Sequence, residues 1–305
     1  MRRFSLVSFD GKVALITGAG NGLGKSHALM FAKLGARVVV NDYGTTAKGE
    51  GADKSPADAV VDEIKTAGGE SVANADSVEH GARLVETAMD AFGRLDIVVN
   101  NAGFLRDTSF HKMSQDDWFD IVNVHLNGAF KVNRAAWPHM REQNFGRIVN
   151  TASAAGIYGN FGQVNYSSAK LALHGMTQAL AIEGQKRNIL VNTVAPAAAS
   201  RLTDTVISRE QTAALRPEYV SPLVGYLCSE VSTQTGGLFE AGAGWFGKLR
   251  WERSRGIALK GVIAPDDIAK NIDAIAEFSD ATHPRNIAEA FAPFGEAMGA
   301  AVAAR

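Results

Sequence analysis

The chain has 305 residues, 46% of them hydrophobic and 21% charged, with a formal net charge of −1 at pH 7. This composition is typical of a globular protein and allows one large α/β domain or two small ones. The charge gives no general attraction to nucleic acid or to an anionic membrane surface. The single cysteine, Cys228, excludes an intrachain disulfide and a cysteine zinc site.

The two ends of the sequence carry none of the common targeting patterns. The start, MRRFSLVSFDGK, has no long apolar run, so we expect no signal peptide. The end, AVAAR, differs from the peroxisomal address Ser-Lys-Leu. No stretch approaches the roughly 20 apolar residues that span a bilayer. We therefore expect a cytoplasmic protein without a membrane span.

Short apolar runs alternate with helical patterns over the first 200 residues. The runs that indicate β-strands are VALIT (13–17), ARVVVND (36–42), a short run ending at Asp76, LDIVVN (95–100), RIVNTAS (147–153) and ILVNTVAP (189–196). Between them, helical periodicity occurs in 26–35, 57–68, about 80–92 and the segment around 166–170. Residues 44–56 are polar and glycine-bearing, which is typical of a surface loop. The alternation predicts an α/β fold with a doubly wound parallel sheet and helices on both faces.

The strand–helix alternation weakens after about Gly236. Residues 236–256 are rich in glycine, aromatic residues and arginine, and the tail from 266 is helical and alanine-rich. No linker or internal repeat interrupts the chain. We therefore expect one domain over residues 1–305, with a core of about 10–235 and a C-terminal extension of about 236–305.

A glycine loop lies between the first strand and the first helix, over Thr17–Gly24. Such a loop lets the backbone approach a pyrophosphate at a helix N-terminus. Asp42 ends the next strand, 18 residues after Gly24, close to the spacing of an acid that binds the ribose of a dinucleotide. The combination predicts a Rossmann-type cofactor site that favours NAD over NADP, because a carboxylate repels the 2′-phosphate. The loop residues assigned to this site are Gly18, Asn21, Gly22, Leu23 and Gly24.

Ser153, Tyr166 and Lys170 form a candidate catalytic set. Tyr166 and Lys170 are four residues apart, which places both side chains on one helix face. A free tyrosine has a pKa of about 10, and we expect the nearby ammonium of Lys170 to lower it so that Tyr166 can act as a base. Ser153 ends a strand and can hold the oxygen of a substrate. A Tyr–Lys pair alone also occurs on many solvated helix faces.

Together these residues resemble the short-chain dehydrogenase/reductase family over residues 10 to about 230. The resemblance rests on Gly18, Gly22 and Gly24, on Asn100-Asn101-Ala102-Gly103, on Ser153, and on Tyr166-Ser-Ser-Ala-Lys170. A closer resemblance is to one branch, the (3R)-hydroxyacyl-CoA dehydrogenase units of multifunctional β-oxidation enzymes. It is carried by NNAGFLRDTSF, by TASAAGIYGNFGQVNYSSAK and, beyond the common core, by GGLFEAGAGWFGKLRWER.

The resemblance implies NAD-dependent oxidation of a (3R)-3-hydroxyacyl-CoA to the 3-oxoacyl-CoA. It implies Tyr166 as the catalytic base, Lys170 as its activator and a ribose ligand, and Ser153 as the ligand of the substrate oxygen. It also implies adenine contacts at Asp76, Ser77 and Val78, and nicotinamide-ribose contacts near Asn101. A homodimer or homotetramer is expected, with any hydratase step supplied by a separate protein.

Two positions depart from the family pattern. His125 stands where many members carry an asparagine that orders a water for proton relay, so His125 or Asn127 could order that water, or the relay could differ. The usual Pro-Gly after the sixth strand is Pro196-Ala197, which stiffens the start of the loop 198–220, the expected substrate lid.

Other functions stay open at this point. A hydroxysteroid dehydrogenase, or a dehydrogenase for the hydroxyacyl-CoA side chain of a steroid, is the alternative enzyme, and a non-catalytic NAD-binding sensor is the alternative of another class. An NADPH-dependent 3-oxoacyl reductase is opposed by Asp42. The histidines show no metal-ligand spacing, so no metal site is expected. Lys248, Arg250, Arg253 and Arg255 either hold the phosphates of coenzyme A or serve as scaffold, and we favour scaffold.

Overall fold

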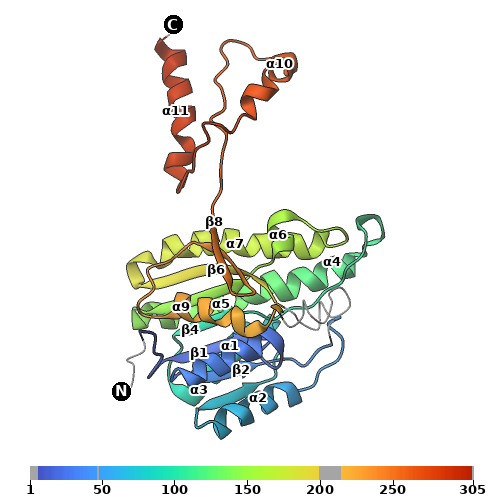
Figure 1. Ribbon diagram of the computed structural model, residues 1–305, viewed down its shortest axis with the longest axis vertical. Helices are drawn as coiled ribbons and strands as arrows, with labels where there is room; N and C mark the ends of the chain where they lie inside the picture. Colours follow the sequence, from blue (N-terminus) through green and yellow to red (C-terminus); the bar gives the residue numbers. More distant parts are fainter. Residues whose placement is uncertain (1–5, 47, 199–213, 304–305) are drawn as a thin grey trace. The chain divides into compact units, whose positions relative to one another are not determined.

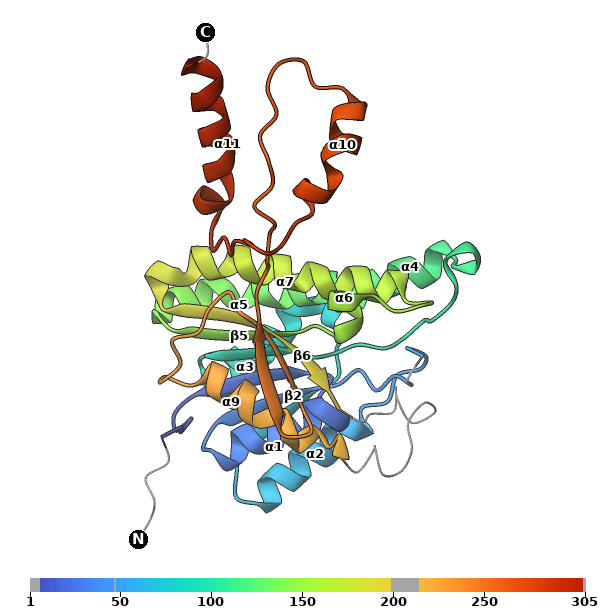
Figure 2. The ribbon, with the colours of Figure 1, turned by 45° about the horizontal axis from the view of Figure 1, so that its top comes forward.

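The computed structural model describes residues 6–46, 48–198 and 214–303. Figures 1 and 2 show the chain from two directions, and the elements are numbered as in Figure 1. Contacts within the chain divide it into two compact units, Met1–Lys248 and Leu249–Arg305. Each unit is described by itself.

An eight-stranded sheet organises the first unit, with the strand order β3-β2-β1-β4-β5-β6-β7-β8. Neighbouring strands from β3 through β7 are parallel. The strands are β1 (Val13–Thr17), β2 (Arg37–Asn41), β3 (Ser71–Asn74), β4 (Ile97–Asn100), β5 (Gly146–Thr151), β6 (Ile189–Ala197), β7 (Leu238–Gly242) and β8 (Trp245–Leu249).

Helices cover both faces of this sheet (Figure 1). They are α1 (Gly22–Lys33), α2 (Ser55–Thr66), α3 (Gly81–Phe92), α4 (Gln115–Val122), α5 (Ala129–Gln143), α6 (Ala154–Tyr158), α7 (Val164–Gly184) and α9 (Ser221–Cys228). A π-helical turn, Asn123–Gly128, joins α4 to α5. The doubly wound fold predicted from the sequence is therefore confirmed.

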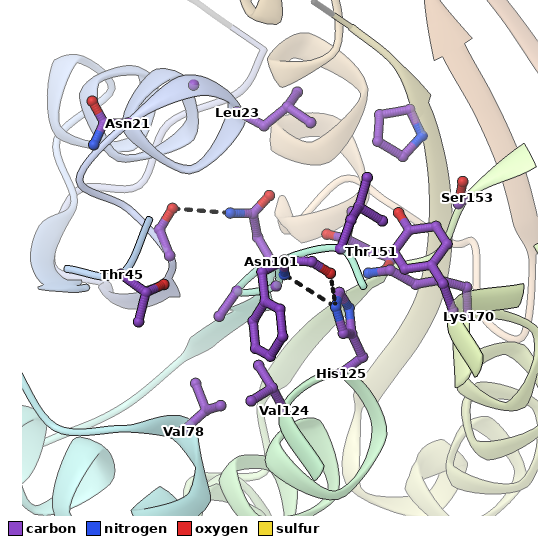
Figure 3. Close-up of a pocket in the computed structure, with 18 of the residues that line it drawn as sticks. Asn21, Leu23, Thr45, Val78, Asn101, Val124, His125, Thr151, Ser153 and Lys170 are labelled. Atoms are coloured by element: carbon purple, nitrogen blue, oxygen red, sulfur yellow. Dashed lines mark hydrogen bonds between the residues drawn. The ribbon is translucent and has the colours of Figure 1, made fainter. Parts of the chain in front are cut away.

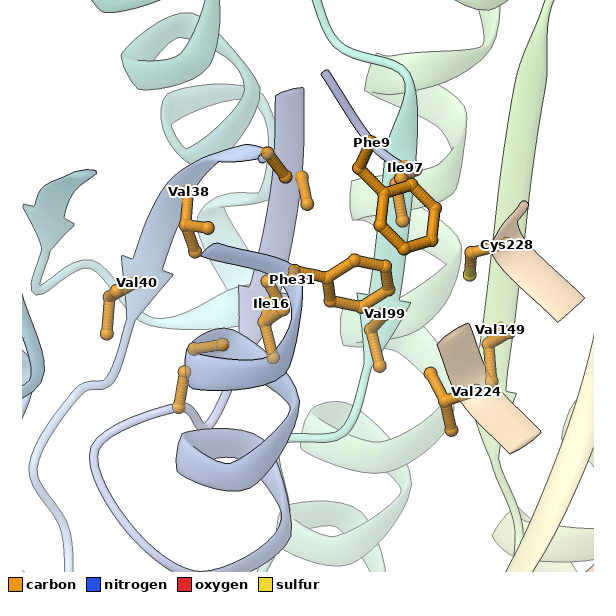
Figure 4. Packing of buried hydrophobic residues seen from close by; sticks show 14 of the residues in the cluster. Phe9, Ile16, Phe31, Val38, Val40, Ile97, Val99, Val149, Val224 and Cys228 are labelled. Atoms are coloured by element: carbon orange, nitrogen blue, oxygen red, sulfur yellow. The ribbon is translucent and has the colours of Figure 1, made fainter. Parts of the chain in front are cut away.

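Successive residues of each strand serve opposite cores, because side chains alternate across a sheet. Ile16 of β1 packs in one cluster with Phe31 of α1 and Val224 of α9, and Figure 4 shows this cluster. Leu15, its neighbour in the chain, packs in the other cluster with residues of α3 and α5. Ile16, Phe31 and Leu15 are completely buried. Burial on both faces explains why these strands are continuous apolar runs.

The order of the strands reverses at β1, which pairs with β2 on one side and with β4 on the other. In open α/β sheets, ligands bind outside the carboxyl ends of the strands at such a point. The glycine loop follows β1, and the Asn100–Gly103 segment begins at the end of β4. The fold therefore brings two of the motifs to one crevice.

All six strands expected from the sequence are present, although the third ends at Asn74 and not at Asp76. The strands β7 and β8 were not predicted from the sequence, and they lie beyond the expected end of the core at about 235. Ala243 and Gly244 connect these two strands with φ of 50° and 81°. Two central residues with positive φ are typical of a type I′ hairpin turn. Glycine-rich sequence that looked irregular is thus a tight turn between strands.

The second unit contains α10 (Pro265–Ile275) and α11 (Ile287–Ala303), which confirms a helical tail. An antiparallel bridge joins Arg253 to Thr282, and the Ser254 hydroxyl donates to the carbonyl of Ile275 at 2.6 Å. Among the described residues of the whole chain, no helix is both long and apolar enough to cross a membrane.

Candidate active site

A pocket of about 630 Å³ lies in the first unit at the carboxyl ends of the central strands. Figure 3 shows it with its lining side chains. The predicted site residues that line it are Gly18, Asn21, Gly22, Leu23, Asp42, Asp76, Ser77, Val78, Asn101, Ser153, Tyr166 and Lys170. Residues that are up to 152 positions apart in the sequence therefore converge on one cavity.

The glycine loop is shaped by backbone conformation and close approach. Gly18 and Gly22 have φ of +62° and +52°, a region that L-residues with a side chain rarely adopt. A Cβ on Gly18 would lie 2.7 Å from the Cα of Ala102. Gly24 does not line the pocket, and a Cβ there would collide with the carbonyl oxygen of Gly18. Gly24 therefore allows the start of α1 to pack closely against the loop after β1.

Asn101 braces this loop from the neighbouring strand. Its side-chain amide donates to the carbonyls of Thr17 at 3.0 Å and Gly18 at 3.1 Å. Its backbone N–H donates to the Thr17 hydroxyl at 2.9 Å. Behind it, the Asn100 amide donates to the side chains of Asn133 and Asn150. Asn101 thus lies in the pocket and also fixes the loop that forms its floor.

Asp42 is held by the backbone on both sides of its carboxylate. One oxygen accepts from the N–H of Gly20 and the other from the N–H of Gly44, each at 2.7 Å. A Cβ on Gly20 would lie 2.7 Å from this carboxylate. Each oxygen keeps a further lone pair, so the geometry suits a ligand with two hydroxyl groups.

Asp76, Ser77 and Val78 follow β3 and line the same end of the pocket. The Asp76 carboxylate accepts from the Asn74 amide at 3.1 Å and pairs with Arg83 at 3.3 Å. The Ser77 hydroxyl caps a short 3₁₀ turn that begins at Val78. Val78 lines the pocket as an apolar side chain next to the carboxylate of Asp76, and it is 6% exposed.

Ser153 and Tyr166 lie at the other end of the pocket. Ser153 follows β5 and is the N-cap of α6, where its hydroxyl accepts from the N–H of Ala155. Tyr166 is in the first turn of α7. Burial raises the pKa of Tyr166, and the hydrogen bond from the Ser153 hydroxyl lowers it. The serine and the tyrosine are therefore arranged to share one ligand oxygen.

Lys170 lies one turn after Tyr166 and is 4% exposed. Its ammonium donates to the carbonyl of Thr151 at 2.6 Å and lies 5.6 Å from the centroid of the Tyr166 ring. Burial lowers the pKa of Lys170 to about 7. The predicted lowering of the Tyr166 pKa by Lys170 is not seen, because burial of the phenol and the charge of Asp107 raise this pKa. The sequence did not indicate Thr151 as the partner of the lysine.

Of the two relay candidates, the pocket is lined by His125 and not by Asn127. The π-helical turn carries both, and such turns add a residue that redirects side chains. His125 Nε2 lies 2.8 Å from the carbonyl and 3.1 Å from the N–H of Phe104, whereas the Asn127 amide donates to Asn123. His125 Nδ1 is buried and has no hydrogen-bond partner among the described residues. Burial holds the pKa of His125 well below its usual value, so the ring is neutral at pH 7.

Two further residues line the pocket near Tyr166 and were not identified from the sequence. Asp107 follows the Asn100–Gly103 segment, and Gln163 lies three residues before Tyr166. Their proximity to two recognised motifs was the available signal. Of the expected lid 198–220, residues 199–213 lie outside the described residues. Ala197 extends β6, and Ala198 lines the pocket.

Lys248, Arg250, Arg253 and Arg255 form the basic segment. Lys248 donates to the side chain of Gln234 at 2.8 Å, and Arg253 donates to the carbonyl of Ala290 at 2.8 Å. Glu252, which lies among these cations in the sequence, pairs with His283 at 3.2 Å. The bonds of Arg253 lie within the second unit, which agrees with scaffold for this residue.

Comparison with known proteins agrees with this geometry. Residues 12–214 match the short chain dehydrogenase family, so the chain belongs to that family. It is 55% identical over 288 residues to the peroxisomal multifunctional enzyme type 2 of Mus musculus, which covers 93% of this chain and 39% of that protein. The chain thus belongs to a family of oxidoreductases that use NAD or NADP, and it is also highly similar to a multifunctional enzyme.

Solved structures show the same two similarities. The full-length peroxisomal multifunctional enzyme type 2 of Drosophila melanogaster aligns with a TM-score of 0.82 and 40% identity, over 95% of this chain and 50% of that one. A short chain dehydrogenase of Mycobacterium avium aligns with a TM-score of 0.77 and 39% identity, over 88% of this chain and 95% of that one. The chain thus spans half or less of the two multifunctional enzymes named here.

Proposed function

We propose that the chain is an NAD-dependent dehydrogenase that oxidises the 3-hydroxyl of a (3R)-3-hydroxyacyl-CoA to the ketone. The observation that carries the proposal is one pocket with the glycine loop and Asp42 at one end and Ser153, Tyr166 and Lys170 at the other. The similarity to enzymes named peroxisomal multifunctional enzyme type 2 supports the substrate.

The residues present fit a dinucleotide. Gly18 lines the pocket, and its lack of a side chain avoids a collision with Ala102. The loop backbone can therefore approach a pyrophosphate closely. Asp42 offers free lone pairs to ribose hydroxyls, and the apolar surface of Val78 beside Asp76 suits an adenine. NAD bound by these residues would supply the acceptor for the hydride of the substrate carbon.

The side chains divide the work at the hydroxyl group. The Ser153 hydroxyl donates a hydrogen bond to the substrate oxygen and orients it beside Tyr166. The phenolate of Tyr166 removes the hydroxyl proton as the carbon-bound hydride leaves. Lys170, with a pKa of about 7, both holds and releases a proton near neutral pH. It therefore returns the proton from Tyr166 towards solvent while remaining anchored to Thr151.

The preference for NAD over NADP follows from charge. Asp42 would repel a phosphate on the ribose. Asn21 and Tyr43, which also line this end of the pocket, are not basic side chains and supply no cation to offset the repulsion.

Steady-state kinetics test the proposal directly. We expect reduction of NAD with (3R)-3-hydroxyacyl-CoA substrates, with a kcat/KM that exceeds the value for a hydroxysteroid and the value with NADP. Faster oxidation of the hydroxysteroid would assign the alternative dehydrogenase. Binding of NAD without turnover of either substrate would assign a sensor.

Three further expectations complete the proposal. We propose one dehydrogenase domain that acts as a homodimer or homotetramer, which light scattering of the purified protein tests. A hydratase is expected as a separate protein, so the purified chain should not hydrate an enoyl-CoA. We propose a cytoplasmic location, whereas the relatives named above are peroxisomal by name, and cell fractionation decides between the two.

A further inference from the structure

Asp107 is an acid of the pocket near Tyr166, and no described residue pairs with it as a cation. Asp107 follows β4, lines the pocket and is exposed to solvent. Within the described part of the chain it has no ion-pair partner. Its neighbour Arg106 instead approaches Asp117 at 3.7 Å and Asp120 at 3.4 Å. The charge of Asp107 is therefore left for whatever enters the pocket.

The position of this carboxylate is fixed by a buried amide. Gln163, 7% exposed, donates from Nε2 to Asp107 Oδ2 at 2.7 Å, and its Oε1 accepts from Asn160 at 3.0 Å. The backbone N–H of Thr108 donates to the carbonyl of Gly162 at 2.9 Å, which ties the same two loops together. A carboxylate only accepts hydrogen bonds, so it sets the orientation of the Gln163 amide.

One oxygen of this carboxylate keeps its lone pairs for a ligand. The described residues provide a donor to Oδ2, from Gln163, and none to Oδ1 of Asp107. Asp107, Gln163 and Asn160 all line the pocket. This wall of the pocket therefore presents a held hydrogen-bond acceptor that carries negative charge.

Base chemistry alone gives no reason for this charge. Four groups face Tyr166, namely the Ser153 hydroxyl, the neutral ring of His125, the ammonium of Lys170 and the carboxylate of Asp107. The His125 and Tyr166 ring centroids are 5.2 Å apart, and Lys170 Nζ lies 5.6 Å from the centroid of the Tyr166 ring. Burial raises the pKa of Tyr166 most, Ser153 lowers it, and the charge of Asp107 raises it again. The charge of Asp107 thus disfavours the phenolate form of Tyr166. We therefore look for its role in the binding of a substrate.

We propose that Asp107, held by Gln163, selects pantetheine thioesters, an assignment that rests on the proposed function. The arm of such a substrate carries an amide N–H a few bonds beyond the thioester sulfur, and Asp107 accepts from it. A free 3-hydroxy acid instead places a carboxylate where the neutral thioester would be, and Asp107 repels it. A hydroxysteroid offers no N–H donor. Coenzyme A and acyl carrier proteins share the pantetheine arm.

The test compares three substrates with one acyl group, all in the R configuration. The 3-hydroxybutyryl N-acetylcysteamine thioester has the amide N–H, the S-propyl thioester lacks it, and 3-hydroxybutyrate carries the free charge. Asp107→Asn removes the charge but keeps an acceptor, whereas Asp107→Ala removes both. Asp116→Asn is the matched control, because Asp116 is an exposed acid that does not line the pocket.

We expect Asp107→Asn to raise kcat/KM for 3-hydroxybutyrate, relative to the S-propyl thioester, about tenfold, the scale of one charge interaction at an exposed site. We expect Asp107→Ala to cut the preference for the N-acetylcysteamine over the S-propyl thioester about tenfold, the scale of one charge-assisted hydrogen bond. Asp107→Ala should lose the same preference over the S-propyl thioester when the acyl group is carried by coenzyme A or by an acyl carrier protein. The carrier whose thioester has the larger kcat/KM with the wild type is the carrier that the enzyme prefers.

Ratios within twofold of wild type in both variants, with an unchanged Tm and KM for NAD, overturn the selection by Asp107. The same change in Asp116→Asn also overturns it, since the effect would then be one of net charge. Failure of the wild type to oxidise either thioester overturns the proposed function instead. Kinetics of the wild type alone therefore separate the two failures.

Discussion

The glycine-loop end of the pocket is shaped by backbone, whereas the Tyr166 end depends on buried side chains. Gly18 and Gly22 adopt positive φ, and Asp42 is fixed by two backbone N–H groups. At the other end, burial lowers the pKa of Lys170 to about 7 and raises the pKa of Tyr166. One end recognises shape and charge, and the other holds protons under unfavourable solvation.

This difference predicts that substitutions at the two ends change different kinetic constants. Those near Tyr166 should lower kcat and leave cofactor binding intact. Those near Asp42 should change cofactor KM and leave kcat at saturation nearly intact. Each of the following experiments can break that separation.

The largest effect is expected for Tyr166→Phe. Loss of the phenolic oxygen removes the base, so kcat should fall at least about a hundredfold, the scale of general-base catalysis, with KM for NAD within about threefold of wild type. Tyr158→Phe is the control, because Tyr158 is 68% exposed and its hydroxyl donates to Glu240 outside the pocket. Near-normal turnover by a folded Tyr166→Phe variant would remove Tyr166 from its role.

A smaller effect is expected for Asp42→Ala. Loss of hydrogen bonds to a charged group should raise KM for NAD about tenfold, and loss of the charge should improve NADP relative to NAD. Steady-state kinetics with both cofactors measure this, and Asp62→Ala, an exposed acid of α2, controls for net charge. An unchanged cofactor preference would show that Asp42 does not reach the ribose.

The sequence predicted the cofactor end more completely than the Tyr166 end, and the reason is physical. A glycine loop followed by an acid depends on local backbone geometry and short spacing, which Gly18, Gly22 and Asp42 preserve in the sequence. The partners of the catalytic set depend on long-range packing. Lys170 meets the carbonyl of Thr151, a backbone atom that any residue would supply, so no sequence pattern could mark it.

The remaining differences have similar causes. The direction of the pKa shift at Tyr166 depends on how deeply Tyr166 itself is buried, which spacing does not reveal. Asp107 and Gln163 come from loops 56 residues apart, and their pairing requires the fold. By contrast, β1, β2, β4, β5 and β6 were predictable because most of their residues are buried, which makes them continuous apolar runs. β7 was missed because Leu238–Gly242 is short and set among glycines.

A third prediction concerns the cost of holding Lys170. Its pKa is lowered from 10.5 to about 7 in the folded protein, so the unfolded chain binds more protons between these values. The stability of the wild type should therefore rise with pH from about 7 to about 10. A Lys170→Met variant lacks this term, so Tm of the variant minus Tm of the wild type should fall across that range.

Melting temperatures measured at intervals from pH 7 to 9.5 check this difference. Lys131→Met is the control, because Lys131 is exposed on α5. A constant difference between Lys170→Met and wild type would mean that the lysine stays fully charged when folded. Lys170→Met should also lower kcat, which keeps the stability term tied to the Tyr166 end of the pocket.

The smallest effect is expected for Arg250 and Arg253 of the second unit. Their substitution tests whether the pocket alone binds the substrate. Arg253 donates to the carbonyl of Ala290, and its backbone bridges Thr282, so its bonds serve its own unit. We expect Arg250→Gln and Arg253→Gln to change KM for an acyl-CoA less than about twofold, the scale of an exposed ionic contact. Arg253→Gln should also lower hydrogen-exchange protection around Thr282, and Arg250→Gln should not. A larger rise in KM for the acyl-CoA than for the N-acetylcysteamine thioester would instead assign these arginines to the phosphates of coenzyme A. The substrate would then be bound by residues outside the two ends of the pocket as well.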